Sequence, residues 1–356
     1  MIDKVLKERK IPNVTEGVSS LADWEKKREE IKKLLQSEEY GFLPPRPYKI
    51  ETTVSEEKTE PNFAGGKATL KKIYLTAFWE DKQFAFPFYS MVPNGKCNMP
   101  AILHINFRDN IPDRYMPSEE LTDNGFAVFS FCYKDVTDDS PDFSDGLAGV
   151  LFEDGKRDKT DCGKLAMWAW AAMCVTDYIV TLSDIDKERI FVCGHSRLGK
   201  TALLTAAFDN RFACAYSNDS GCSGAAITRE KCGETVRDIC AKFEYWFCEN
   251  YKKYIDNEQS LTFDQHFLIA LIAPSMVYVA SAEEDLWSDP KSEQLALFAA
   301  SGVWELYGKR GFVSKKRFAD VGECLHDGCI GYHLRKGTHF FNRTDWLHFI
   351  DYINTK

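Results

Sequence analysis

The stretch that most constrains how this chain folds is residues 189–200, RIFVCGHSRLGK. A short apolar run is followed by Gly194, Ser196 and Gly199, and the next residues, TALLTAAF, are typical of a helix. Strand, sharp turn and helix in this order predict a nucleophile elbow, in which the turn presents a serine hydroxyl above the end of a parallel sheet. The spacing departs from the common G-x-S-x-G pattern because Leu198 comes before the second glycine. Ser196 is therefore the candidate nucleophile, and a buried serine in an ordinary strand-to-helix turn is the alternative.

Apolar runs on both sides of this turn predict an α/β fold. Before residue 100, alternating apolar and polar residues indicate the antiparallel edge of a sheet, at 48–54, 68–78 and 84–92. After residue 100, continuous apolar runs separated by helical patterns indicate parallel strands buried on both faces, at 101–107, 126–132, 190–193, 214–217 and 276–281. We expect a three-layer α/β/α sandwich of the α/β-hydrolase kind, with a mostly parallel central sheet and an antiparallel N-terminal edge. The site is expected at the carboxyl ends of the strands.

The remaining segments give no sign of a second domain. Residues 1–45 are predicted to be an N-terminal helical segment packed on a single domain that spans residues 1–356, since no linker or internal repeat divides the sequence. Two long acidic segments, 107–124 and 133–162, are predicted to be loops over the top of the sheet. Loops of that length in a compact domain usually serve a site.

The charge balance excludes several classes of partner. The chain has 54 acidic and 45 basic residues, a net charge of -9, which argues against nucleic acid or an anionic membrane as the main partner. The apolar run at 165–175 is too short to span a bilayer. The charged N-terminus lacks the apolar run of a signal peptide, so we expect a cytoplasmic protein, or a secreted one if a signal has been removed. We expect a monomer.

The twelve cysteines do not suggest a disulfide framework. Most of them, such as Cys174 and Cys193, lie inside apolar runs, where cysteine behaves as a small buried hydrophobe. We expect the thiols to be reduced. Residues 324–329, CLHDGC, include ligand-type side chains, but no second pair at zinc spacing follows them. No metal and no cofactor is predicted.

A nucleophilic serine needs a base, and in this fold the chain order is serine, acid, histidine. Four histidines follow the last predicted core strand: His326, His333, His339 and His348. His339 lies in the polar turn RKGTHF between a short predicted strand and the last predicted helix, where a catalytic histidine belongs. His333 falls inside that strand and His348 inside the helix, so structural roles suit them better. We expect His339 to be the base, with His326 as the alternative.

Two carboxylates compete to orient the base. Asp219, in SNDSG, follows one core strand, and Asp285, in SAEEDLWSD, follows the next. Either could reach the imidazole, and Glu283 is a third candidate. For each of them the alternative is a capping or turn carboxylate, which is common directly after a strand.

Two further residues could line the same site. Lys200 lies about one helical turn after Ser196, so both side chains can face the same opening. Trp287, two residues after Asp285, offers an aromatic ring. The alternatives are a solvated helix lysine and a core tryptophan.

Several motifs together resemble a known family. They are GHSRLGK at 194–200, DSGCSGAA at 219–226, FDQHFLIALIAP at 263–274 and DLW at 285–287. In this order they are similar to the glucuronoyl esterases of carbohydrate esterase family 15, especially the bacterial branch. The resemblance runs from about residue 100 to the C-terminus.

The resemblance implies a role for each matching residue. Ser196 matches the nucleophile, His339 the general base, and Arg197 an arginine that stabilises the oxyanion together with its own backbone N–H. The residues that match positions holding the glucuronate sugar are Lys200, Glu234 and Trp287.

The acid departs from the commoner pattern of the family. Fungal members have a glutamate at the position of Asp219, and some bacterial members use an acid at the position of Asp285. Because Asp219 is one methylene shorter, we expect Asp285 to be the acid, with Asp219 second or sharing the role. The fungal cysteine before the serine is His195 here, so its disulfide is absent.

The resemblance implies a serine esterase that cleaves the ester between (4-O-methyl-)glucuronate side chains of xylan and a lignin-type or simple alcohol, through a glucuronoyl-enzyme intermediate. The alternative enzyme is an acetyl xylan esterase or another carbohydrate deacetylase with the same triad. A catalytically silent carbohydrate-binding protein on the same fold is the alternative from a different class.

Overall fold

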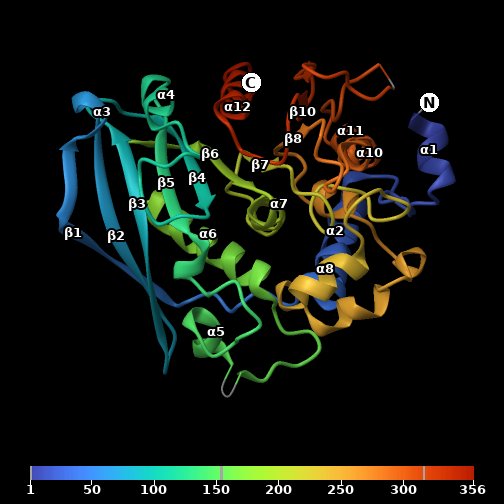
Figure 1. Ribbon diagram of the computed structural model, residues 1–356, viewed down its shortest axis with the longest axis horizontal. Helices are drawn as coiled ribbons and strands as arrows, with labels where there is room; N and C mark the ends of the chain where they lie inside the picture. Colours follow the sequence, from blue (N-terminus) through green and yellow to red (C-terminus); the bar gives the residue numbers. More distant parts are fainter. Residues whose placement is uncertain (1, 153–154, 316) are drawn as a thin grey trace.

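One mixed β-sheet organises the protein in a computed structural model that describes residues 2–152, 155–315 and 317–356 (Figure 1). Within these ranges the sheet has ten strands in the order β1-β2-β3-β5-β4-β6-β7-β8-β10-β9. The strands are β1 (Lys49–Asn62), β2 (Ala68–Phe78), β3 (Gln83–Pro93), β4 (Met99–Asn106), β5 (Ala127–Cys132), β6 (Ile185–His195), β7 (Cys214–Asn218), β8 (Met276–Ala282), β9 (Cys324–Leu325) and β10 (Ile330–Arg335).

The strand directions confirm a mostly parallel sheet with an antiparallel N-terminal edge. Strands β5, β4, β6, β7, β8 and β10 are parallel neighbours, whereas β1, β2 and β3 pair antiparallel with one another and β3 pairs antiparallel with β5. Strand β1 extends beyond the predicted strand at 48–54. Its second half is almost wholly exposed and carries no apolar alternation, so the sequence pattern did not indicate it. It is held there by its pairing with β2.

Helices cover both faces of the sheet, as predicted for an α/β/α sandwich. The helices of the described chain are α1 (Ile2–Glu8), α2 (Leu21–Leu35), α3 (Phe63–Gly66), α4 (Ser118–Asp123), α5 (Gly146–Leu151), α6 (Lys164–Ile179), α7 (Arg197–Phe208), α8 (Val236–Phe243), α9 (His266–Ala270), α10 (Pro290–Ala300), α11 (Gly302–Leu306) and α12 (Arg343–Asn354). None of the helices in the part of the chain that the structure describes is long and apolar enough to span a bilayer.

Alternate residues of the central strands point into two separate cores. One core, with α6 and α7, contains Leu103, Phe129, Val192, Ala215 and Val279. The other, with α12 and α4, contains Ile102, Val128, Phe191, Tyr216 and Tyr278. Because both faces are apolar, these strands are the continuous hydrophobic runs seen in the sequence.

The N-terminal segment lies against the later half of the chain (Figure 1). Arg9 donates to Ser292 Oγ on α10 at 2.6 Å, and the Pro12 carbonyl lies 2.8 Å from His266 Nε2. Helix α2 continues into a π-helical turn, Gln36–Tyr40, whose Tyr40 hydroxyl lies 3.1 Å from Gln265 Oε1. This half includes residues 227–262, for which the sequence pattern gave no secondary structure.

Strands β6, β7, β8 and β10 end side by side. His195 on β6 pairs with Asn218 on β7, Asn218 with Ala280 on β8, and Ala282 with Arg335 on β10. The turns that follow these strands therefore meet at one edge of the sheet. The two predicted acidic loops contain the short helices α4 and α5, and their residues 153–154 lie outside the described ranges, as does residue 1 of the N-terminal segment.

Candidate active site

Ser196 lies in the sharp turn between β6 and α7. Its backbone has φ 57° and ψ −126°, a conformation that costs energy for a residue with a side chain and that is found at functional turns. The neighbouring glycines are required by close contacts. A Cβ at Gly194 would lie 2.2 Å from the Leu198 carbonyl oxygen, and one at Gly199 would lie 2.9 Å from Ser217 Oγ. The second glycine thus stands one place late because α7 packs there against β7, while Leu198 is fully buried.

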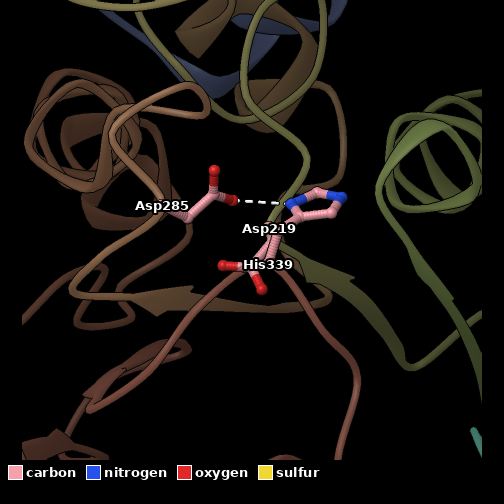
Figure 2. Close-up of side chains that lie close together, drawn as sticks. All are labelled: Asp219, Asp285 and His339. Carbon is pink, nitrogen blue, oxygen red and sulfur yellow. Dashed lines mark hydrogen bonds and ion pairs between the residues drawn. The ribbon is translucent and has the colours of Figure 1, made fainter.

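His339 and Asp285 form a hydrogen-bonded pair beside this turn (Figure 2). The distance from His339 Nδ1 to Asp285 Oδ2 is 2.6 Å, and the Asp285 carboxylate is buried while the imidazole is partly exposed. Burial raises the pKa of Asp285, but the hydrogen bond and charge of His339 and the hydrogen bond from Ser288 N outweigh it and hold the pKa below its usual value. Among the described residues His339 Nε2 has no hydrogen-bond partner, so it is available to a serine or to substrate.

His195, next to Ser196 in the chain, packs against His339 with ring centroids 4.5 Å apart. His195 Nδ1 lies 2.6 Å from Asn218 Oδ1, and since an amide oxygen only accepts, Nδ1 carries the proton. Burial, and then the charge of His339, lower the pKa of His195 to about 3. The His195 imidazole is therefore uncharged. It lines the site without adding positive charge beside His339.

Asp219 lies close to the same imidazole but is bound elsewhere. Its Oδ1 accepts from Ala282 N at 2.8 Å, and its Oδ2 accepts from Arg335 Nη2 at 3.3 Å. Burial and the neighbouring carboxylates of Glu293 and Asp285 raise its pKa well above the usual value, against the opposing effect of Arg335. In Figure 2 the dashed contact of His339 runs to Asp285 and none runs to Asp219.

Asp219, Asp285 and His339 could also be considered as metal ligands, since one donor atom of each lies within 4.8 Å of the others. The donors are already used, because His339 Nδ1 is bound to Asp285 and Asp219 is bound to Arg335. A guanidinium beside one of the three also disfavours a cation there. The group fits a hydrogen-bonded acid and base better than a metal site.

Arg197 follows Ser196 at the start of α7 and points into an aromatic cluster. Its guanidinium lies 4.6 Å from the Trp246 ring and 5.1 Å from the Phe243 ring, and it is paired with Asp139. Trp246 Nε1 donates to the same carboxylate at 2.8 Å. The buried Nε of Arg197 has no hydrogen-bond partner within the described chain.

Lys200, Glu234 and Trp287 are linked by contacts with one another. Lys200 is buried and donates to the carbonyls of Ser220 and Cys222, both at 2.5 Å, with Glu234 Oε2 at 3.8 Å. Burial lowers its pKa, against the opposing charge of Glu234. Glu234 N donates to the Trp287 carbonyl at 3.0 Å, and Trp287 is 48% exposed. Lys200 is thus no solvated helix lysine, and Trp287 is no core tryptophan.

The other late histidines lie outside this cluster. His333 lies between Tyr278, at 2.8 Å, and Asp345, at 3.0 Å, and His348 Nδ1 lies 3.4 Å from Cys324 Sγ. His326, the alternative base, lies 2.9 Å from the Tyr278 hydroxyl. Their partners belong to β8, β9 and α12 and not to the serine turn.

Two residues at the site were missed by the sequence reasoning, Asp139 and Arg335. Asp139 lies in the long acidic loop predicted to serve a site, and length and charge were the only signals available. Arg335 ends β10 and contacts the His339 turn. No local pattern distinguishes it from the other arginines of the chain.

Comparison with known proteins gives a consistent result. A family model described as "Glucuronyl esterase, fungi" matches residues 76–308. "Carbohydrate esterase MZ0003", from an unknown prokaryotic organism, is 33% identical over 95% of this chain and 86% of that protein. A "4-O-methyl-glucuronoyl methylesterase" of Podospora anserina is 28% identical over 82% of this chain, which spans 58% of the fungal protein. A solved "Glucuronoyl Esterase from Solibacter usitatus" superposes with a TM-score of 0.86 at 32% identity, over 97% of both chains.

Proposed function

This chain belongs to the glucuronoyl esterase family, carbohydrate esterase family 15, and we propose that it hydrolyses the ester between (4-O-methyl-)glucuronate of glucuronoxylan and a lignin-type or simple alcohol. It is an ester hydrolase of the α/β-hydrolase type. The observation that carries the proposed chemistry is the 2.6 Å contact between His339 Nδ1 and Asp285 beside the strained turn of Ser196.

In the proposed reaction Ser196 is the nucleophile and His339 the general base. His339 Nε2 takes the proton of the Ser196 hydroxyl as Oγ attacks the ester carbonyl carbon of the uronate. The tetrahedral intermediate collapses to a glucuronoyl-enzyme ester, and the alcohol leaves with the proton from Nε2. Water then attacks in the same way, which releases glucuronate and restores the serine.

Asp285 is proposed as the acid of the triad. Its carboxylate accepts from His339 Nδ1, which keeps Nε2 unprotonated and facing the serine and stabilises the imidazolium that forms. The lowered pKa keeps Asp285 ionised at neutral pH. Asp219 is proposed as a supporting carboxylate, since both of its oxygens accept from other groups.

Arg197 is proposed to stabilise the oxyanion. Its backbone N–H is among the first of α7, where amide groups lack helical partners, and it directly follows the serine in the chain. Donors that are already in place for the developing charge need no reorganisation during the reaction. Asp139, Phe243 and Trp246 hold the guanidinium.

Lys200, Glu234 and Trp287 are proposed to hold the sugar. The ammonium and carboxylate are polar groups in a buried setting, suited to hydroxyl groups, and the exposed indole offers a face for the pyranose ring. Lys200 lies one helical turn after Ser196, and its contacts connect it to Glu234 and Trp287, which favours a uronate ester over a small acetyl ester. Two of the relatives named above are called a 4-O-methyl-glucuronoyl methylesterase and a glucuronoyl esterase, so deacetylation is not favoured.

We further propose that residues 1–356 act as one domain, since a single ten-stranded sheet runs through the described chain, and that the protein is a monomer. The carbohydrate substrate needs no basic surface, and the net charge of -9 disfavours nucleic acid. All twelve cysteines are free, and Cys97 and Cys232 are exposed. Exposed free thiols suit a reducing compartment such as the cytoplasm.

Hydrolysis of methyl and benzyl glucuronate, compared with an acetyl ester, tests the proposal. The wild type should cleave both glucuronate esters, and Ser196→Ala should lower kcat by about 10⁴-fold or more. Lys200→Ala should reduce cleavage of glucuronate esters far more than that of the acetyl ester. Wild-type activity confined to acetyl esters would disprove the substrate assignment, and full activity of Ser196→Ala would disprove the nucleophile.

A further inference from the structure

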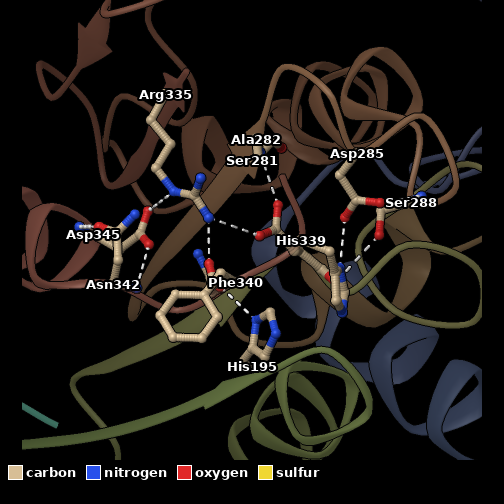
Figure 3. A network of polar contacts seen from close by, with 12 residues as sticks. His195, Ser281, Ala282, Asp285, Ser288, Arg335, His339, Phe340, Asn342 and Asp345 are labelled. Carbon is tan, nitrogen blue, oxygen red and sulfur yellow. Dashed lines mark hydrogen bonds and ion pairs between the residues drawn. The ribbon is translucent and has the colours of Figure 1, made fainter. Parts of the chain in front are cut away.

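Arg335, the last residue of β10, is buried and contacts three parts of the molecule at once (Figure 3). Its Nε donates to Asp345 Oδ1 at 2.7 Å, and its Nη2 donates to Asp219 Oδ2 at 3.3 Å. Nη1 donates to the Lys336 carbonyl at 3.2 Å, and Nη2 also bonds the Phe340 carbonyl. The two bonded carbonyls lie on either side of His339 in the chain, so the guanidinium closes the turn that carries the imidazole.

The turn is also joined to the segment that carries Asp285. Glu283 N donates to the Arg335 carbonyl and Glu284 N to the Gly337 carbonyl, both at 2.9 Å. These bonds bring the two loops together along their backbones. They do not fix the far side of the turn at Phe340, which is held by the Arg335 side chain.

Gly337 shows how closely this turn is wrapped around the guanidinium. Its φ is +107°, and a Cβ at this position would lie 3.3 Å from Arg335 Nη1. Asp345, to which the Arg335 guanidinium also binds, is held in place. It is fully buried, accepts from Asn342 N at 2.8 Å and forms a capping box at the start of α12. The guanidinium therefore connects the end of β7, the His339 turn and α12.

We propose that Arg335 is a positioning residue for the reaction: by binding the Lys336 and Phe340 carbonyls while anchored on Asp219 and Asp345, it holds the His339 imidazole against Asp285 and over the serine turn. This inference rests on the proposed roles of Ser196, His339 and Asp285. A planar guanidinium is needed because it has five N–H donors in a fixed arrangement, whereas a lysine ammonium is a single point donor that cannot serve all four acceptors.

The test compares Arg335→Gln and Arg335→Lys with Arg343→Gln. Arg343 is the matched control, since it lies eight residues further on and makes an exposed ion pair with Glu120. With a glucuronate ester, Arg335→Gln should lower kcat by about 10- to 100-fold with KM changed less than about threefold, because a displaced base slows chemistry more than binding. Arg335→Lys, which keeps the charge, should recover part of the loss, and Arg343→Gln should match the wild type.

Two substrate-independent measurements separate this inference from the proposed function. The first is the rate at which a fluorophosphonate labels Ser196, which should fall in Arg335→Gln. The second is the downfield proton resonance of His339 Nδ1–H, which the Asp285 contact should produce in the wild type and which Arg335→Gln should broaden or lose. The wild type could fail to cleave glucuronate esters while the labelling rate and the Nδ1–H resonance of Arg335→Gln still change as expected. The proposed substrate would then be wrong, and the positioning role of Arg335 would be supported.

The positioning role of Arg335 is disproved if Arg335→Gln, shown by circular dichroism to be folded, keeps the wild-type kcat, labelling rate and Nδ1–H resonance. If Arg335→Gln does not fold, Arg335→Lys decides the question. Arg335→Lys should show a reduced kcat, an unchanged KM and slower labelling of Ser196. Wild-type values of all three would equally disprove the positioning role of Arg335.

Discussion

The turns that follow β7 and β8 lie side by side, and each carries a buried aspartate close to His339. Asp285, after β8, contacts the imidazole at 2.6 Å and receives a further bond from Ser288 N. Asp219, after β7, is bound to Ala282 N and to Arg335. The same type of side chain therefore has two different sets of hydrogen-bond partners.

The electrostatics of the two carboxylates differ in the same way. The pKa of Asp285 is lowered, since bonding to His339 and Ser288 outweighs burial, whereas the pKa of Asp219 is raised because burial and the carboxylates of Glu293 and Asp285 outweigh Arg335. A carboxylate that must stabilise an imidazolium has to be ionised. The comparison teaches that proximity alone does not identify the acid of a triad.

The largest effect that tests this comparison is expected for Asp285→Asn. The amide would donate to His339 Nδ1, which would leave the proton on Nε2 and prevent it from accepting the serine proton. We expect kcat to fall by about 10³- to 10⁴-fold at neutral pH, with little change in KM. Steady-state kinetics on benzyl glucuronate measure it, and a loss of less than tenfold would show that another group orients His339.

A smaller effect is expected for Asp219→Asn. The asparagine Oδ1 can still accept from Ala282 N, and Arg335 keeps Asp345 and the two carbonyls of the His339 turn. We expect kcat to fall by about tenfold or less, because a supporting group loosens without changing the tautomer of the base. The same assay with both variants side by side decides the comparison. If Asp219→Asn loses as much activity as Asp285→Asn, the two aspartates share the role.

The smallest effect is expected for Glu293, a third buried carboxylate, and it concerns the pH dependence of stability. It accepts from Gly221 N at 2.9 Å and from Ser281 Oγ at 2.5 Å, and burial raises its pKa to about 7. A carboxyl group with a raised folded-state pKa stabilises the fold most below its unfolded pKa near 4.5 and loses that contribution as the pH rises through 7. The free energy of unfolding should therefore fall between pH 5 and pH 8 by less in Glu293→Gln than in the wild type. The difference between the two decreases should be on the order of 2 kcal/mol.

Glu39 provides the control for that measurement. Its pKa is also raised to about 7 by burial, but its carboxylate bonds Gln265 at 3.0 and 3.1 Å, whereas the pKa of Glu293 is also raised by the charge of Asp285. Urea unfolding at both pH values should show a similar flattening for Glu39→Gln, while only Glu293→Gln should alter the pH dependence of kcat. An altered profile in both variants would mean that general loosening, and not charge near Asp219 and Asp285, is responsible.

Much of the fold could be predicted because its signals are local. The continuous apolar runs and the alternating stretches together predicted six strands close to their observed ends, such as Ala68–Phe78, whose predicted bounds are those observed. The exposed second half of β1 carried no such signal, since hydrogen bonding to β2 and not burial holds it. Helix α8, within residues 227–262, is not among the predicted elements, although Val236, Ile239, Cys240 and Phe243 follow the helical i, i+3, i+4, i+7 spacing. The helix is only eight residues long, and short 3₁₀ turns follow it.

The site was predictable in kind but less so in arrangement. Ser196 and His339 follow from the turn pattern and the chain order, and the resemblance added Glu234 and the sugar-binding roles of Lys200 and Trp287. Asp139 and Arg335 could not be found, since each acts through a partner from another element, as Asp139 does with Arg197. The catalytic roles of all these residues remain predictions for the variants described above.

By itself the sequence determined which residues turn, which strands are buried on both faces, and hence that a serine and several acids and histidines gather at one edge of a sheet. These properties depend on neighbours a few positions apart. Only the tertiary structure decided that Asp285 faces His339, 54 positions away, and that Asp219 faces Arg335, 116 positions away. The reason is physical: both acids end equivalent strands, and which one reaches the imidazole depends on how buried charges from distant segments are paired, since an unpaired buried charge is too costly to leave.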